Sequence, residues 1–235
     1  MLKNSKNLID QMIKLKKDDK AKNLSRFFKT DKGEYGEGDL FLGISVLDTR
    51  KMIKNYAHLD TKEISKLLTN KYHEIRLIGL LVLVRRYQKS NKAEQKEIFN
   101  FYLKNTNYIK NWDLVDLSAY HIVGDYLLNK NRKILYKLAK SKNIWERRIA
   151  VVSTYTFIKN RENHDIFELT KILLNDKHDL IHKACGWMLR ESGKSVSEKD
   201  LELFLEENYH KMPRTMLRYA IEKFSDSKRQ HFLKK

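Results

Sequence analysis

The sequence contains few of the residues that bend or cross-link a chain. Its 235 residues include one proline, eight glycines and one cysteine, Cys185. Strand-rich folds need more turn-forming residues than this, so the composition favours a mostly helical protein. A single cysteine excludes an internal disulfide and is typical of proteins in a reducing cytoplasm.

Long apolar segments are missing as well. No apolar run reaches the roughly 18 residues that a membrane-spanning helix needs, and no signal peptide is visible after Met1. We therefore expect a soluble cytoplasmic protein that does not span a membrane. Walker, dinucleotide-binding and nucleophile-elbow motifs are also absent, and we predict no cofactor.

Positive charge, in contrast, is abundant. The chain has 48 Lys and Arg residues against 30 Asp and Glu residues, which is a formal net charge of +18. The basic residues are spread along the chain, which favours a folded basic surface over a disordered basic tail. Such a surface usually binds a polyanion, with nucleic acid as the first candidate and an anionic membrane as the second.

Apolar residues recur every three or four positions through most of the chain, as in IWERRIAVVSTYTFIK. This period predicts helices. Segments that open with a polar or aromatic turn and continue as an apolar helix start 32 to 39 residues apart, near His73, Trp112, Ile144, Asp179 and Met212. Two-helix solenoid repeats have a similar length. We predict an all-α, single-domain solenoid of HEAT-like helical pairs over residues 1–235, with a concave basic face.

The stretch KNWDLVDL places acids in this basic chain. Asn111 is a candidate N-cap, and Asp113 would complement the helix dipole in the first turn. Asp116 stands four residues after Trp112, so the indole and the carboxylate share one helix face. A carboxylate there could stabilise a developing positive charge or orient an attacking water. The alternative is an Asp116 paired with a nearby Lys or Arg.

Two further stretches combine tryptophan with arginine. IWERRIAV contains Trp145, Arg147 and Arg148, and GWMLRE contains Trp187 and Arg190. An arginine fork suits a phosphate oxygen. The competing interpretation is a core tryptophan beside solvated or ion-paired arginines.

Metal binding is not expected. His178 and His182 stand four residues apart, but no third ligand is evident. Cys185 lies in an apolar helix and is interpreted as an inert core residue. Residues 26–44, RFFKTDKGEYGEGDLFLGI, hold four of the eight glycines and are interpreted as a long surface turn.

Taken in order, RFFKTDKGEYGEGDLFLGI, NWDLVDLSAYHIVGDYL, IWERRIAVVSTYTFIK and HKACGWMLRESGK resemble the DNA alkylation repair (AlkD-like) family of HEAT-like-repeat DNA glycosylases. The resemblance covers nearly the whole chain. It implies that Asp116 is the catalytic carboxylate, that Trp112 and Trp187 pack against the damaged nucleotide, and that Arg148 holds a phosphate. Family members often have Pro at the position of Leu47 and Gly at that of Asp31, which affects only the shape of the first loop.

The resemblance also implies an activity: monofunctional hydrolysis of the N-glycosidic bond of cationic N3- and N7-alkylpurines in double-stranded DNA, as part of base excision repair. Trp145, Arg147 and Arg190 are predicted to bind DNA beside Arg148. A monomer associated with the nucleoid, with no membrane partner, is expected. Two alternatives stay open. One is a non-catalytic solenoid that binds damaged or branched DNA. The other is a protein-binding scaffold, for which binding would be insensitive to salt.

Overall fold

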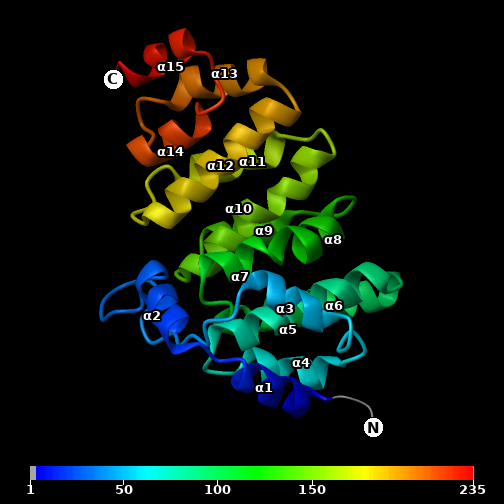
Figure 1. The fold of residues 1–235 in the computed structure, drawn as a ribbon. Coiled ribbons are helices and arrows are strands. Elements are labelled where there is room, and N and C mark those ends of the chain that lie inside the picture. Colours follow the sequence, from blue (N-terminus) through cyan, green and yellow to red (C-terminus); the bar gives the residue numbers. More distant parts are fainter. Residues whose placement is uncertain (1–3, 235) are drawn as a thin grey trace. The chain divides into compact units, whose positions relative to one another are not determined.

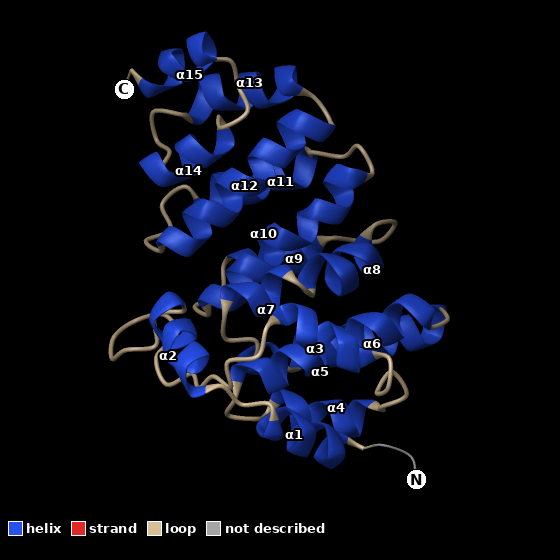
Figure 2. Ribbon diagram, viewed as in Figure 1, coloured by secondary structure: helices blue, strands red, loops and turns tan. Residues whose placement is uncertain are grey.

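The structure, a computed structural model, describes residues 4–234, and its regular structure is helical (Figure 2). Within this range there is no strand, and a single isolated parallel bridge joins Leu40 and Tyr72. The predicted all-α class is therefore confirmed. The chain divides into two compact units, Met1–Ser118 (unit 1) and Ala119–Lys235 (unit 2). The prediction of one domain over the whole chain stays a prediction.

Unit 1 is built around α5 (His73–Lys89), whose residues are mostly buried. Its partners are α3 (Val46–Ile53), α4 (Thr61–Leu68), α6 (Lys92–Lys104) and α7 (Trp112–Asp116). A helix that is apolar on nearly every side is stable only where neighbours cover it on nearly every side, which explains the central place of α5. The unit also contains α1 (Ser5–Lys14), α2 (Asp18–Phe27) and the short η1 (Thr106–Tyr108) (Figure 1).

Residues 28–45, here named the connecting segment, join α2 to α3 without forming a helix. The middle of the segment is largely exposed, but Phe28 and Phe41 near its ends are buried, 7% and 4% exposed. The interpretation of this region as a surface turn is therefore wrong for both ends. Apolar side chains at the two ends bury against the rest of unit 1, and only the glycine-rich middle behaves as a turn.

Unit 2 begins with a short π-helix, η2 (Tyr120–Gly124), and α8 (Asp125–Leu127). It continues through α9 (Lys133–Ala139), α10 (Ile144–Lys159), α11 (His164–Leu173), α12 (Asp179–Ser195), α13 (Glu198–Asn208), α14 (Arg214–Ala220) and α15 (Asp226–Leu233) (Figure 1). Neighbouring helices pair as α9 with α10 and α11 with α12, while α10 packs on α12 and α12 packs on α14. This is the stacking of successive helical pairs that the repeat spacing predicts.

Two glycines let helices approach closely in unit 2. A Cβ added at Gly186 would lie 2.5 Å from the Met216 carbonyl oxygen, and one at Gly124 would lie 2.3 Å from the Ser153 carbonyl oxygen. Any larger residue would force the backbones apart. The contacts of α12 with α14 and of η2 with α10 therefore depend on glycine.

The predicted starts of the repeats agree well with the structure. Helices begin at His73, Trp112, Ile144 and Asp179, and the fifth begins at Arg214 rather than near Met212. Asn111 is the predicted cap of α7, and its side-chain oxygen accepts from the Trp112 N–H at 2.8 Å. Asn143 caps α10 in the same way. Short polar side chains satisfy the N–H groups that a first helical turn leaves without partners, so the starts at Trp112 and Ile144 could be predicted from the sequence, whereas no side chain caps the helix that begins at His73. The predicted concave basic face stays a prediction.

Candidate active site

Unit 1 contains a cavity of about 660 Å³, here named the unit 1 cavity. It is formed by α2, the connecting segment, the start of α5, and α7. The lining residues are Lys20, Asn23, Leu24, Phe27, Phe28, Phe41, Gly43, Ile44, Ser45, Val46, His73, Glu74, Leu77, Trp112, Asp113, Asp116 and Leu117. The structure thus brings Trp112 and Asp116 to one cavity, in agreement with the helical face they were predicted to share.

Aromatic rings form one wall of the cavity. The Phe28 ring stacks against Trp112 on one side and against Phe41 on another, with both pairs of centroids 5.1 Å apart. Phe27 meets Trp112 edge-on at 5.9 Å and is 63% exposed. Rings in these offset and edge-on arrangements hold one another in place. The wall is therefore ordered before any ligand arrives.

His73 lies against this wall and is 2% exposed. Its ring stacks on Phe41 at 4.7 Å and lies 5.0 Å from Phe28. Nδ1 is 3.1 Å from an Asp39 oxygen, and Nε2 is 2.8 Å from an Asp113 oxygen. Burial by itself would lower the pKa of His73, but the carboxylates of Asp113 and then Asp39 outweigh it and raise the pKa to about 9.

Glu74, the residue after His73, joins the connecting segment to α5 through hydrogen bonds. Its carboxylate accepts from the backbone N–H groups of Leu42 at 2.8 Å, Gly43 at 2.8 Å and Ile44 at 3.2 Å. Gly43 has φ of +79°, and a Cβ there would lie 2.4 Å from the Lys17 carbonyl oxygen. Only glycine fits this backbone without strain. The far end of the connecting segment is therefore held firmly beside the cavity.

The unit 1 cavity is acidic although the chain is strongly basic. Glu74, Asp113 and Asp116 line it, against the cationic groups Lys20 and His73. Asp116 also lies close enough to the buried Tyr102 to act on its pKa, which burial raises first and the Asp116 charge raises further. Aromatic faces and carboxylates together attract a flat cation.

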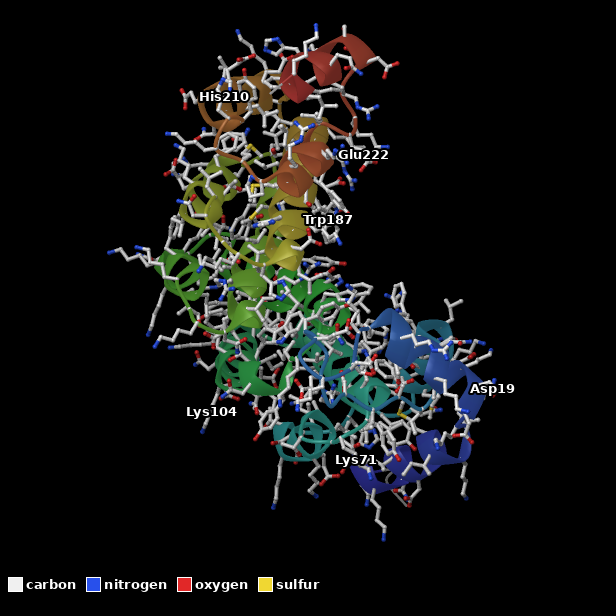
Figure 3. The ribbon with its side chains drawn as sticks, turned by 90° about the vertical axis from the view of Figure 1, so that its left-hand side faces the viewer. Asp19, Lys71, Lys104, Trp187, His210 and Glu222 are labelled. Atoms are coloured by element: carbon white, nitrogen blue, oxygen red, sulfur yellow. The ribbon has the colours of Figure 1, made fainter. Side chains whose placement is uncertain are left out.

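The other predicted tryptophan site lies in unit 2. Trp187 is half-buried on α12, and its ring centroid is 6.2 Å from that of Tyr155 on α10 (Figure 3). Tyr155 in turn meets Tyr120 of η2 edge-on at 5.2 Å. The Lys159 ammonium lies over the Tyr155 ring at 4.7 Å. Half-exposed rings beside a lysine are suited to contacts with a nucleic-acid strand.

The predicted arginines of unit 2 have partners within the protein. Arg147 pairs with Asp176, Nε to Oδ2, at 2.6 Å, and Arg148, 5% exposed, donates from Nη1 to the Leu180 carbonyl oxygen at 2.5 Å. These contacts join α10 to the turn before α12 and to its first residues. A role in DNA binding for either arginine stays a prediction.

Arg190 and Trp145 complete the predicted set. Arg190 pairs with Glu191 at 3.0 Å and with Glu222, which follows α14, and Glu222 is marked with Trp187 in Figure 3. Trp145 is 6% exposed and lies in the first turn of α10. A role in DNA binding for either residue also stays a prediction.

Comparison with known protein families gives a match over nearly the whole chain. The family described as "DNA alkylation repair enzyme" matches residues 8–224. The chain belongs to this family. The resemblance seen in the sequence motifs is therefore confirmed, and alkylation repair, with DNA as the substrate, is the function that membership indicates.

A solved structure shares the fold of this DNA alkylation repair family member. It is described as "Predicted DNA alkylation repair enzyme from Enterococcus faecalis", superposes with a TM-score of 0.70, and is 16% identical. The match covers 90% of this chain and 97% of that one. At this identity the likeness concerns the fold alone. Comparison with curated proteins finds no match.

The described part of the chain offers neither a metal site nor a membrane-spanning helix. Among residues 4–234 no group of three or more His, Cys, Asp or Glu side chains is placed to hold a metal ion. His178 caps α12, and His182 Nε2 lies against the Asp176 carbonyl oxygen at 2.5 Å. No helix in that range is long and apolar enough to cross a membrane. Cys185 is fully buried, as predicted, and burial raises the pKa of its thiol to about 12.

Sequence reasoning did not identify the buried charged residues that surround Trp112 and Asp116. His73 was noted only as the start of a repeat, and Asp113 only as an acid near a helix N-terminus. Asp39 and Glu74 were not singled out. One signal was available: the charged residues of YHEIR come directly before the apolar run LIGLLVLV, and ionisable groups are rarely buried unless they are paired.

Proposed function

We propose that the protein is a DNA glycosylase that hydrolyses the N-glycosidic bond of cationic N3- and N7-alkylpurines in duplex DNA. The observation that carries the proposal is the presence of Trp112 and Asp116 at one acidic, aromatic cavity in a chain of net charge +18. The basic chain favours a polyanion, and the acidic cavity favours a positively charged part of it.

The chemistry needs little more than a well-placed carboxylate. An alkylated purine is already a cationic leaving group, so no strong general acid is required. As the bond to the base breaks, positive charge moves onto the sugar. The Asp116 carboxylate would stabilise this oxocarbenium-like transition state and orient the water that attacks the sugar carbon. Proton loss from that water completes the hydrolysis.

The aromatic wall would assist the same step. Trp112 presents its ring at the cavity with Phe28 stacked against it. A cation over an indole face gains about 0.5–2 kcal/mol, with the larger value where water is excluded. Because positive charge is shared between base and sugar in the transition state, this attraction supports catalysis as well as binding.

Trp187 would pack with Trp112 against the sugar and backbone of the damaged nucleotide. Arg148 would hold a phosphate, and Arg147 and Arg190 would bind the duplex beside it. Trp145 belongs to the same predicted DNA-binding set. The protein would act as a monomer without a cofactor.

The test is release of free base from a duplex that carries a single N7-methylguanine. Wild type should release the base, and Asp116→Asn should do so about 10²- to 10³-fold more slowly, as expected for loss of one group aimed at developing charge. Asp19→Asn, an exposed acid of α2 (Figure 3), is the matched control and should keep wild-type activity. Salt-sensitive duplex binding without base release would instead indicate a non-catalytic DNA-binding protein.

A further inference from the structure

His73 lies between two carboxylates from different parts of unit 1. Its two ring nitrogens face Asp39 at 3.1 Å and Asp113 at 2.8 Å. A neutral imidazole has one N–H group, so its other nitrogen would turn a lone pair toward a carboxylate. The imidazolium, in contrast, donates to both. The geometry therefore favours a doubly protonated ring.

The charged groups around this ring are few and have defined places. Arg76 donates to the second oxygen of Asp39 and shares that carboxylate with His73. The Glu74 carboxylate is occupied by three backbone N–H groups. Asp116 and Lys20 line the same cavity. With these neighbours, Asp39 and Asp113 are the groups that hold the proton on His73.

The two carboxylates belong to two of the elements that form the cavity, α7 and the connecting segment. Asp113 lies in the first turn of α7, one residue after Trp112 and three before Asp116. A helix of five residues has few internal hydrogen bonds, so its orientation depends on tertiary contacts. Asp39 belongs to the connecting segment, whose Phe28 and Phe41 form the aromatic wall. His73 thus adds a polar link between α7 and the connecting segment to the stacking of Trp112 on Phe28.

We propose that His73 is a positioning residue, which as an imidazolium shared by Asp39 and Asp113 holds α7 so that Trp112 and Asp116 keep their places at the unit 1 cavity. The consequence for catalysis rests on the proposed function, but the consequence for the geometry of α7 does not. Loss of the proton removes one of the two hydrogen bonds and leaves a carboxylate facing a lone pair. The environment of Trp112 and the rate of base release should then change together as pH rises.

The first experiment observes Trp112 directly and needs no activity. The protein is labelled with fluorotryptophan, and the three fluorine signals, one for each tryptophan, are assigned with Trp112→Phe, Trp145→Phe and Trp187→Phe. In wild type the Trp112 signal should titrate with a midpoint near 9. His73→Gln, which has no proton to lose in this range, should abolish that titration.

His231→Gln is the matched control for this titration. His231 also faces a carboxylate, that of Glu206 at 2.9 Å, but its side chain is 57% exposed in unit 2. The variant should keep the wild-type titration of Trp112. A Trp112 signal that does not titrate in wild type, or that titrates equally in His73→Gln, would overturn the proposal.

The second experiment measures base release in single turnovers with enzyme in excess, with a blank without enzyme at each pH. Wild type should lose rate as pH rises through about 9. His73→Gln should be at least about 10-fold slower at neutral pH, with duplex affinity changed much less, because α7 and not the DNA contacts is disturbed. His73→Arg keeps a permanent cation and should recover activity without the alkaline decline.

The results separate the two proposals. An inactive wild type whose Trp112 still titrates through His73 would reject the glycosylase and support the positioning role. An active wild type whose Trp112 signal does not titrate would support the glycosylase and reject the positioning role of His73. If His73→Gln does not fold, the titration of the Trp112 signal in wild type and the pH profile of base release by His73→Arg test the proposal. A loss of rate above about pH 9 that persists in His73→Arg would contradict a role for the His73 proton.

Discussion

The two units hold their predicted site residues in different ways. In unit 1, Trp112 and Asp116 open onto a cavity, and the buried charges of His73 and Asp113 lie behind them. In unit 2, Arg147 is tied to Asp176 by an ion pair that joins neighbouring elements. Both sets look alike in sequence, as a tryptophan followed by a charged residue two to four positions later. They differ in their surroundings, because Trp112 and Asp116 line a cavity whereas Arg147 is paired with the turn before α12.

The largest expected effect comes from the carboxylate of unit 1. Asp116→Asn should slow base release about 10²- to 10³-fold, whereas Trp187→Phe in unit 2 should cost about 10-fold or less because an aromatic ring remains. Single-turnover rates on N7-methylguanine duplex measure both. Equal losses in the two variants would show that the chemistry does not depend on the unit 1 cavity in particular.

The next effect concerns pH and stability. The pKa of His73 is raised to about 9 from the usual 6.5, so its stabilisation of the folded state is complete below about 6.5 and is lost as pH rises through about 9. Wild type should therefore lose on the order of 3 kcal/mol of unfolding free energy across this window relative to His73→Gln. Denaturant unfolding of both proteins at a series of pH values tests this. Parallel pH profiles would contradict it.

Smaller effects, on stability and on duplex binding, should distinguish Arg147 from Arg190 in unit 2. Arg147→Met removes a largely buried ion pair, 17% and 6% exposed, and should lower the unfolding free energy by about 1–3 kcal/mol. Arg190 pairs with Glu191, its neighbour in the chain, and with Glu222, which is 45% exposed, so Arg190→Met should cost less stability than Arg147→Met. Arg190→Met should also reduce the salt dependence of duplex binding by about 0.9 in the log–log slope.

Denaturant unfolding and duplex binding at several salt concentrations measure both arginine variants. A normal stability in Arg147→Met, together with a reduced salt dependence of duplex binding, would show that Arg147 contributes to DNA binding and not to the contact with Asp176. The opposite pattern in Arg190→Met, a loss of stability with an unchanged slope, would assign it to the interface of α12 with the end of α14.

The smallest effect is expected at an exposed pair of unit 2. Glu198 and Lys228 lie 2.6 Å apart, with side chains 52% and 40% exposed. Solvent and salt screen such pairs, so Glu198→Gln should unfold within error of wild type. A clear loss of stability would mean that surface ion pairs contribute more to unit 2 than the comparison with the buried pairs assumes.

Helices and their starts could be predicted because the signals are local. Asn111 caps the helix that its own chain neighbours form, and the spacing of Trp112 and Asp116 places them on one face whatever surrounds them. The buried ends of the connecting segment could not be predicted in the same way. Phe28 and Phe41 are apolar, but their neighbours KTDKGEYGEGD are polar and glycine-rich, so the local pattern indicates a solvated turn.

The sequence by itself determined the all-α class, the starts of several helices, the positive charge and the family. These follow from composition, from a period of three to four residues, and from motifs that lie within short stretches. Only the tertiary structure decided that Asp113 and Asp39 are the hydrogen-bond partners of His73, because they are 40 and 34 residues from His73 along the chain. A buried charge is stable only where folding brings an opposite charge to it, and no local pattern states which one that will be.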